Sequence, residues 1–212
     1  MDIARKHDLI LFADEIYDRL VMDGEQHVAL ASLAPDLLTL CYNGLSKSHR
    51  VAGFRCGWLC LAGNKKNAQG FISGLNLLAT LRLCSNVPGQ SIIQTALGGY
   101  QSCDELLKPG GRIYEQREYI YEALSALPGV SVVKPKAAFY IFPRFDANMY
   151  HIDSDEQFAL DLLRREKVLI NHGTGMNMDT HDHFRIVFLP DLIVLKDAMT
   201  RIERFLRRRR SE

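Results

Sequence analysis

The chain of 212 residues is long enough to bury a substantial core, arranged as one large domain or two small ones. Hydrophobic residues make up 47% and charged residues 24%, which is ordinary for a soluble globular protein. Because 26 Lys and Arg residues nearly balance 25 Asp and Glu residues, no overall charge favours nucleic acid or an anionic membrane as a partner.

The lack of a recognisable targeting signal and the cysteine usage both lead us to expect a soluble, unexported protein. The segment Met1–Asp8 lacks the apolar core of a signal peptide, and no run approaches the roughly 20 apolar residues of a membrane span. The cysteines form an odd set without CxxC spacing, so neither a disulfide framework nor a zinc site is expected. We expect reduced core residues and a cytoplasmic protein. The five are Cys41, Cys56, Cys60, Cys84 and Cys103.

Strands and helices alternate in the first half of the chain. Short apolar runs predict strands buried on both faces at Leu9–Ala13, 37–42 and 56–62. Helical segments are expected at residues 65–83 and 89–100. This alternation favours an α/β layered domain.

The pattern changes around Pro109-Gly110-Gly111, which suggests a division into residues 1–110 and 111–212. The second half predicts a smaller α+β domain with a long amphipathic helix before Pro128, a capping box at Ser154-x-x-Gln157, and a final helix from Asp191. The strands expected here are 130–133 paired with 138–142, then 168–170 and 184–188.

Two polar clusters follow the predicted strands of the first half. Asp14 stands at the end of an apolar run, where open α/β sheets bind ligands, although it equally suits a cap for the next helix. Lys47 lies in a Gly/Ser-rich turn, where desolvation favours the neutral, nucleophilic amine. Ser46, Ser48 and Arg55 supply donors for a doubly charged phosphate. Taken without its neighbours, Lys47 better suits a solvated loop lysine.

These two clusters resemble motifs of a known family. Asp14-Glu15-Ile16-Tyr17 resembles Asp-Glu-x-Tyr, and Ser46-Lys47 with Arg55 and Gly57 resembles Ser-Lys-x(7)-Arg-x-Gly, both in the class I, fold-type I aminotransferases related to aspartate aminotransferase. Lys47 follows Asp14 by 33 positions, which also fits. The amino-acid sequences of several segments are most similar to those of bacterial glutamate–pyruvate (alanine) aminotransferases.

The resemblance implies a pyridoxal 5'-phosphate (PLP) enzyme in which each motif residue has a role. Asp14 would pair with the pyridine nitrogen of the cofactor, and Tyr17 would hydrogen-bond its phenolic oxygen. Lys47 would form the Schiff base and shuttle the substrate proton. Arg55 and Ser46 would bind the phosphate.

The second half carries further resemblances. His183-Phe184-Arg185-Ile186-Val187 is similar to the family's Phe-Arg-Ile motif, by which Arg185 would clamp the substrate α-carboxylate. Residues 135–143 resemble its small-domain strand motif, with alanine where relatives often have glycine. One departure concerns Gly44, because many relatives have a phosphate-binding serine three residues before the lysine. Residues 173–177 resemble a flexible loop near the substrate entrance.

The resemblance covers nearly the whole chain but only part of the family's length. It implies the C-terminal part of the PLP-binding large domain plus the small domain, homodimerisation, and transamination between alanine and 2-oxoglutarate. The N-terminal part, which supplies the stacking aromatic, is expected to be missing. Whether such a truncated enzyme is active or inactive alone stays open, and a non-catalytic fragment is the alternative.

Other functions remain open from the sequence. A PLP-dependent carbon–sulfur lyase would share Asp14, Lys47 and Arg185. A metal site is conceivable at His181-Asp182-His183 with Asp179, although such histidine spacing is commonplace in loops. The run 207–210 of four arginines is expected to be the solvated end of the last helix rather than a nucleic-acid site.

Overall fold

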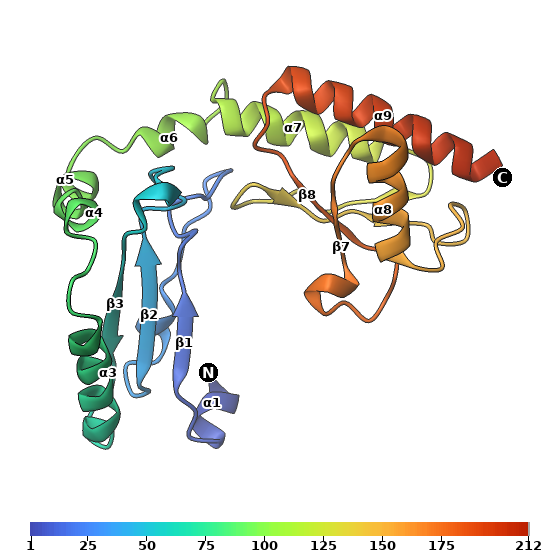
Figure 1. The fold of residues 1–212 in the computed structure, drawn as a ribbon. Coiled ribbons are helices and arrows are strands. Elements are labelled where there is room, and N and C mark those ends of the chain that lie inside the picture. Colours follow the sequence, from blue (N-terminus) through green and yellow to red (C-terminus); the bar gives the residue numbers. More distant parts are fainter. Residues whose placement is uncertain (212) are drawn as a thin grey trace. The chain divides into compact units, whose positions relative to one another are not determined.

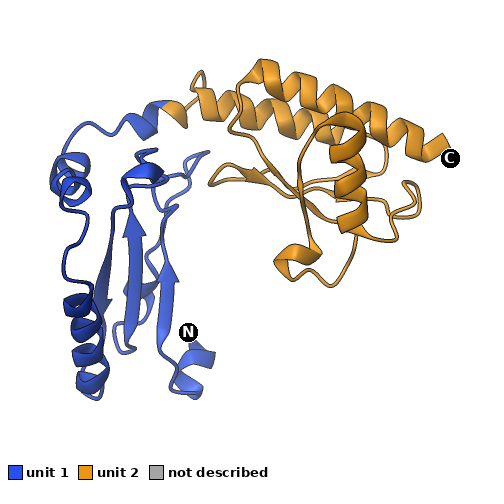
Figure 2. Cartoon of the chain, viewed as in Figure 1, with its two compact units in different colours: residues 1–105 blue, residues 106–212 orange. Residues whose placement is uncertain are grey.

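The computed structural model describes residues 1–211, which form two compact units (Figure 2). Unit 1 comprises residues 1–105, and unit 2 begins at Leu106. The boundary falls at 105, where the sequence suggested 110. Among the described residues, no helix combines the length and the apolar character that crossing a bilayer requires.

Unit 1 is built on a three-stranded sheet in the order β1-β2-β3 (Figure 1). Strand β2 pairs with β1 in parallel and with β3 in antiparallel fashion. The carboxyl ends of β1 and β2 and the amino end of β3 therefore meet at one edge of the sheet. The elements are α1 (Asp2–Lys6), β1 (Leu11–Asp14), α2 (Leu30–Leu33), β2 (Thr39–Gly44), the 3-10 helix η1 (Ala52–Phe54), β3 (Gly57–Ala62), α3 (Gln69–Arg82), α4 (Val87–Ser91), α5 (Ile93–Gly98) and α6 (Ser102–Leu106), which ends in unit 2.

The outer strands of this sheet are less buried than the sequence predicted. In β1 only Ala13 is buried, and Phe12 is 61% exposed. The Phe12 ring stacks on Tyr42 of β2 with centroids 6.2 Å apart, on a face that the described residues leave open. No residue of β3 is buried either. The expectation of burial on both faces is therefore wrong for β1 and β3, which are the edge strands of the sheet.

The helix expected over residues 89–100 is two short helices. Asn86 caps α4 by accepting the Gly89 N–H at 3.2 Å, with Pro88 in the first turn, so helix formation begins earlier than expected. Ile92 then ends α4, because its N–H turns back to the Gln90 carbonyl oxygen, and α5 follows at once.

All five cysteines are free, but they are not all core residues. Cys56 and Cys103 are buried, and burial raises the pKa of the Cys103 thiol. Cys60 and Cys84 are exposed, which contradicts the expectation of burial. Cys60 lies on the edge strand β3, and Cys84 follows α3, none of whose residues is buried.

Unit 2 consists of three helices around short strands and one 3-10 helix (Figure 1). Helix α9 packs against both α7 and α8. The elements are α7 (Arg112–Ser125), β4 (Val130–Ser131), β5 (Tyr140–Ile141), β6 (Arg144–Phe145), α8 (Asp155–Glu166), β7 (Asn171–His172), the 3-10 helix η2 (Thr174–Met176), β8 (Phe184–Val187) and α9 (Leu192–Ser211).

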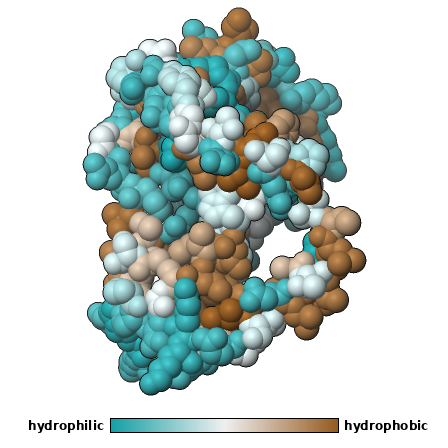
Figure 3. All heavy atoms as spheres, turned by 90° about the vertical axis from the view of Figure 1, so that its left-hand side faces the viewer, coloured by the Kyte–Doolittle hydropathy of each residue, from teal (hydrophilic) through white to brown (hydrophobic). Residues whose placement is uncertain are grey.

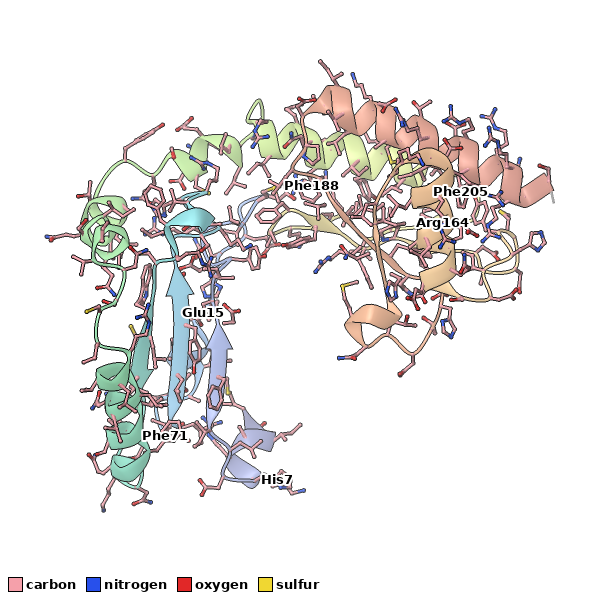
Figure 4. The ribbon with its side chains drawn as sticks, viewed as in Figure 1. His7, Glu15, Phe71, Arg164, Phe188 and Phe205 are labelled. Carbon is pink, nitrogen blue, oxygen red and sulfur yellow. The ribbon has the colours of Figure 1, made fainter. Side chains whose placement is uncertain are left out.

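The core of unit 2 is a buried cluster of aromatic side chains. Phe158 of α8 lies 5.9 Å from Phe145, 4.8 Å from Phe184 and 5.1 Å from Phe205, measured between ring centroids. All four rings are at most 1% exposed. Figure 4 labels Phe205 on α9. Burying rings of this size contributes roughly 1.5–3 kcal/mol each to folding, so the cluster anchors the unit.

Strand pairing in unit 2 differs from the prediction. The strand at Val130 pairs with β6, not with residues 138–142. Strand β5 pairs instead with β8, which also pairs with β7 to give the order β5-β8-β7. The strand expected at 168–170 begins three positions later and is only Asn171–His172. The capping box is confirmed on one side, since Ser154 Oγ accepts the Gln157 N–H at 3.2 Å.

The arginine run at the end of α9 is only partly a solvated helix end. Arg208 donates to the carboxylate of Glu166, a residue 2% exposed that also accepts from Arg204. The guanidinium of Arg209 lies over the Phe158 ring at 5.3 Å. Cations here face a buried acid and aromatic rings, and hydrogen bonding to Arg204 lowers the pKa of Glu166.

Candidate active site

Three of the predicted residue groups meet at the edge of the unit 1 sheet. Asp14 ends β1 opposite Tyr42, so its exposed carboxylate stands at the carboxyl end of the strand. Its Oδ1 accepts the Ile16 N–H at 3.3 Å, which shapes the turn toward Tyr17. The cap-like role and the ligand role of Asp14 are therefore compatible, since the second carboxylate oxygen is not used in that turn contact.

Neighbouring acids fasten this turn to the rest of unit 1. Figure 4 shows Glu15 at the carboxyl end of β1, where its Oε1 accepts the Leu30 N–H at 2.7 Å and lies 3.6 Å from His27 Nε2. Asp18 Oδ2 accepts from Asn43 Nδ2 at 2.8 Å, which ties the turn to β2. Sequence reasoning assigned these residues no role, because their partners lie far along the chain.

Lys47 and Ser46 lie half-buried in a turn immediately after β2. The turn is held by backbone bonds at both sides, from Leu45 N–H to Cys56 O at 3.3 Å and from Arg50 N–H to Lys47 O at 3.3 Å. The lysine amine thus starts from a short, fixed loop at the same edge as Asp14.

A histidine within this turn connects it to a neighbouring helix. His49 Nε2 lies 2.9 Å from the Ala96 carbonyl oxygen, and Nδ1 lies 2.9 Å from Ser48 Oγ. A carbonyl only accepts, so Nε2 carries the proton and Nδ1 accepts from the serine hydroxyl. His49 therefore links the Lys47 turn to α5. Arg50 adds a second link by donating to Ser102 Oγ at 2.7 Å.

The glycine that replaces the family's serine is required by the backbone. A Cβ at Gly44 would lie 2.8 Å from Cys56 O, closer than real Cβ atoms approach, and a tight 3.2 Å from Gly57 Cα. The Gly44 N–H donates to Asn43 Oδ1 at 2.7 Å. A serine therefore does not fit at position 44 in this structure, and the Gly44 N–H is already used.

Arg55 completes the edge. It follows η1 in the left-handed region at φ 49° and directly precedes the buried Cys56 that leads into β3. Its guanidinium is exposed, and Nη1 donates to Ala52 O at 2.9 Å. Asn86, the cap of α4, bonds the neighbouring Phe54 carbonyl. One guanidinium nitrogen of Arg55 is thus held by the backbone, and the exposed side chain presents its cation at the surface.

Arg185 lies in unit 2 on the central strand β8. Its Nη2 donates to Asn171 Oδ1 at 3.2 Å, and its guanidinium carbon lies 4.8 Å from the centroid of the Tyr140 ring. Its Nε is buried without a hydrogen-bond acceptor among the described residues. The side chain lines a cavity of about 450 Å³ whose other walls, apart from Asn171, are mostly apolar.

The residues considered for a metal site face separate partners. His181 Nδ1 lies 3.3 Å from Asp155, whereas His183 Nδ1 lies 2.7 Å from Asp182 Oδ1. Across the described part of the chain, no group of three or more His, Cys, Asp and Glu side chains is arranged to hold an ion.

The loop expected to be flexible is instead anchored. Thr174, which begins η2, donates both its N–H and its hydroxyl to Asp155 at 2.8 Å. Burial raises the pKa of Asp155, but the bonds from Thr174 and His181 outweigh it and hold the pKa below its ordinary value. The charged carboxylate therefore fixes residues 174–176 to the start of α8.

Known proteins similar to this chain show which family it belongs to. The model of the family "Aminotransferase class I and II" matches residues 1–202. A relative from Haemophilus influenzae, glutamate-pyruvate aminotransferase AlaA, is 55% identical over 206 residues, which is 97% of this chain and 51% of that protein. The chain belongs to the class I and II aminotransferases.

Solved structures agree with that membership. An aminotransferase from Escherichia coli superposes with a TM-score of 0.95 at 53% identity, over 97% of this chain and 51% of that one. An alanine aminotransferase from Pyrococcus furiosus gives 0.89 at 34% identity, over 98% and 51%. The fold is the fold type I of the PLP-dependent aminotransferases, and the chain spans about half the length of the curated relatives it matches.

The residues of this aminotransferase chain fit the PLP cofactor of the family. One exposed carboxylate, Asp14, stands at the sheet edge to accept from a ring N–H. A primary amine and a hydroxyl follow in the turn of Ser46 and Lys47, and the exposed guanidinium of Arg55 suits a phosphate dianion. In unit 2, the acceptorless buried Nε of Arg185 suits a carboxylate ligand.

Proposed function

We propose that this chain carries the cofactor-binding and substrate-binding residues of an enzyme that exchanges an amino group between alanine and 2-oxoglutarate. The observation that carries the proposal is the common edge of the sheet, where Asp14, the Lys47 turn and Arg55 meet. The substrate pair follows from the relatives, since proteins named glutamate-pyruvate aminotransferase and alanine aminotransferase are 53–55% identical to the chain.

Each residue has a defined task in this proposal. When bound, PLP supplies an electron sink for the carbon that loses its proton. Asp14 holds a proton at the pyridine nitrogen, and Tyr17 donates to the phenolic oxygen of the ring. Lys47 would hold the cofactor aldehyde through Nζ and, as a free amine, would accept at Nζ the proton that the substrate α-carbon loses.

The remaining residues bind and orient. Ser46 and Arg55 bind the phosphate, and the planar guanidinium offers two parallel donors to it. Arg185 binds the α-carboxylate of the amino acid in the same way. We assign residues 1–110 to the cofactor-binding domain and residues 111–212 to the small domain.

Assembly and compartment are part of the same proposal. Helix α3 has no buried residue, and it exposes Leu77, Leu78 and Leu81 by 59–68%. Figure 3, which views the molecule from the side where α3 lies, shows brown hydrophobic residues gathered at the surface. Exposed apolar patches of this kind mark protein interfaces, which supports a homodimer. Five free cysteines support the cytoplasm.

Trapping the cofactor on the lysine tests the cofactor site. The chain is mixed with PLP, reduced with borohydride and mapped by mass spectrometry, and the cofactor mass is expected on the peptide that contains Lys47. Lys47→Arg should abolish the labelling, whereas Lys65→Arg, which removes an exposed loop lysine, should leave it unchanged. Labelling spread equally over both lysines would contradict the site.

Substrate choice is tested separately. Alanine with 2-oxoglutarate should yield pyruvate and glutamate, and omission of 2-oxoglutarate should stop pyruvate formation after one turnover. Pyruvate released from cystathionine without an oxo-acid acceptor would instead indicate a carbon–sulfur lyase. Trapping on Lys47 without any turnover would indicate a cofactor-binding fragment that is not catalytic alone.

A further inference from the structure

The sheet β5-β8-β7 places two side chains around Arg185. Arg185 lies on the central strand β8, and Asn171 is its direct cross-strand partner on β7. Tyr140 lies on the opposite neighbour β5, where it pairs with Val187, two positions after Arg185 on the same strand. Cross-strand and diagonal neighbours on one face of a sheet are within reach of long and aromatic side chains.

Both neighbours contact the guanidinium. Asn171 Oδ1 accepts from Arg185 Nη2 at 3.2 Å, and the Tyr140 ring lies under the guanidinium carbon at 4.8 Å. A planar cation over an aromatic face is attracted by the ring quadrupole. The two contacts come from the strands on either side of β8, so the flexible arginine is restrained from both sides.

Tyr140 is itself held by the local backbone. Ala138 adopts the left-handed region at φ 59°, which an alanine enters only where the surrounding structure imposes it. The Phe188 N–H then donates to the Phe139 carbonyl at 3.1 Å and continues the pairing of β5 with β8. The strained turn therefore directs Tyr140 against β8, beside Arg185.

We propose that Tyr140 and Asn171 are positioning residues that hold Arg185 ready for the substrate carboxylate. The inference rests on the proposed role of Arg185. An arginine that is already ordered loses less side-chain freedom when it binds a carboxylate, so preorganisation strengthens binding. The aromatic ring is the active feature of Tyr140, so Tyr140→Phe should preserve the effect and Tyr140→Leu should remove it.

The test measures binding of pyruvate, a carboxylate probe, to the PLP-loaded chain, together with the NMR signal of the Arg185 Nε–H. We expect Tyr140→Leu to weaken pyruvate binding about threefold to fivefold and to move the Nε–H signal by loss of the ring current. Tyr140→Phe should restore both. Tyr119→Leu, which removes another half-buried tyrosine of unit 2, should change neither.

Asn171→Ala provides a second variant, and it leaves the core of unit 2 intact because Asn171 is exposed. It should weaken pyruvate binding to a similar extent. In an Arg185→Lys background, Tyr140→Leu should have no further effect, since the planar cation is gone. A purely structural role for Tyr140 would weaken binding equally in both backgrounds, which would overturn the inference.

The outcomes separate this inference from the function on which it rests. If Arg185→Lys binds pyruvate as well as the unchanged chain, the clamp itself is wrong and the inference falls with it. If Arg185→Lys weakens binding but Tyr140→Leu and Asn171→Ala do not, the clamp stands and only the positioning role is overturned.

Discussion

The two units bury their apolar side chains to very different extents. Unit 2 encloses an aromatic cluster centred on Phe158, and its largest helix, α9, buries five residues along one face. Unit 1 carries the residues proposed to bind the cofactor, yet its longest helix, α3, buries none, and Phe12 of β1 is largely exposed. The buried apolar side chains of unit 1, such as Leu20, Leu40 and Leu45, lie outside its longest helix.

The difference indicates how Arg185 in unit 2 and the Lys47 turn in unit 1 are each held in place. Arg185 is placed by a small sheet that rests on a packed core. The Lys47 turn is placed by polar links such as His49 to Ala96 and by the close approach of Gly44 to Cys56. Substitutions in the core of unit 2 should therefore disturb the position of Arg185. Single polar or glycine substitutions in unit 1 should disturb the position of the Lys47 turn.

The largest effect is expected from opening the core of unit 2. Phe158→Ala removes a fully buried ring in contact with three others, and it should lower the free energy of unfolding of unit 2 by about 3–5 kcal/mol. Hydrogen exchange of unit 2 peptides measures this loss. Phe12→Ala is the matched control in unit 1, with an expected cost under about 1 kcal/mol.

Equal losses in the two phenylalanine variants would break the comparison. Such a result would mean that the face of the unit 1 sheet which carries Phe12 is covered in solution as fully as the core around Phe158.

A second effect concerns acid stability of unit 2. Burial raises the pKa of Asp182, but bonds from Thr180, Arg144 and His183 outweigh it and lower the pKa to about 2. A carboxyl whose folded pKa lies below the unfolded value of 3.8 stabilises the fold fully above that pH. We expect on the order of 2 kcal/mol to be lost as the pH falls from about 4 to about 2.

Asp182→Asn should flatten this part of the acid-unfolding profile, measured by urea unfolding at a series of pH values. Asp179→Asn removes an exposed acid from the same loop and serves as the control. A slope that both variants lose equally would show that net charge, rather than the bonded Asp182, sets the acid stability.

The Gly44 contact gives a smaller effect, confined to unit 1. Gly44→Ser places a Cβ against Cys56 O and should destabilise unit 1 by about 1–2 kcal/mol. Gly53→Ala, where a Cβ meets nothing within 4 Å, is the control and should stay within about 0.5 kcal/mol. Trp58, the single tryptophan, faces Asn43 across the sheet, so its fluorescence reports unit 1 alone. A stabilised Gly44→Ser variant would contradict the clash.

Local patterns predicted some of these features and not others. The helical spacing of apolar residues predicted α7 and α9, because each helix buries its own face. The predicted pairing of the strand at Val130 was wrong, because a two-residue strand shows the same alternation of side chains whichever strand it pairs with. Tertiary packing, not local propensity, makes that choice.

The candidate site shows the same division. Motif resemblance named Asp14, Lys47, Arg55 and Arg185, which stay predictions of role. It assigned no supporting role to Glu15, His49 or Tyr140, because each contacts a segment far along the chain. Long-range partners leave no spacing signal, and the fold is needed to find them.

The smallest effect tests the exposed helix of unit 1. Leu77→Gln, Leu78→Gln and Leu81→Gln combined should change the unfolding free energy of unit 1 little, by about 0.5 kcal/mol or less per site, because the three side chains are exposed. Sedimentation measures assembly in parallel, and loss of a dimer with unchanged Trp58 unfolding would locate the interface at α3. Unfolding of the monomer at much lower denaturant would instead show that these leucines pack within unit 1. The contrast between a packed unit 2 and an open unit 1 would then be wrong at its most exposed element.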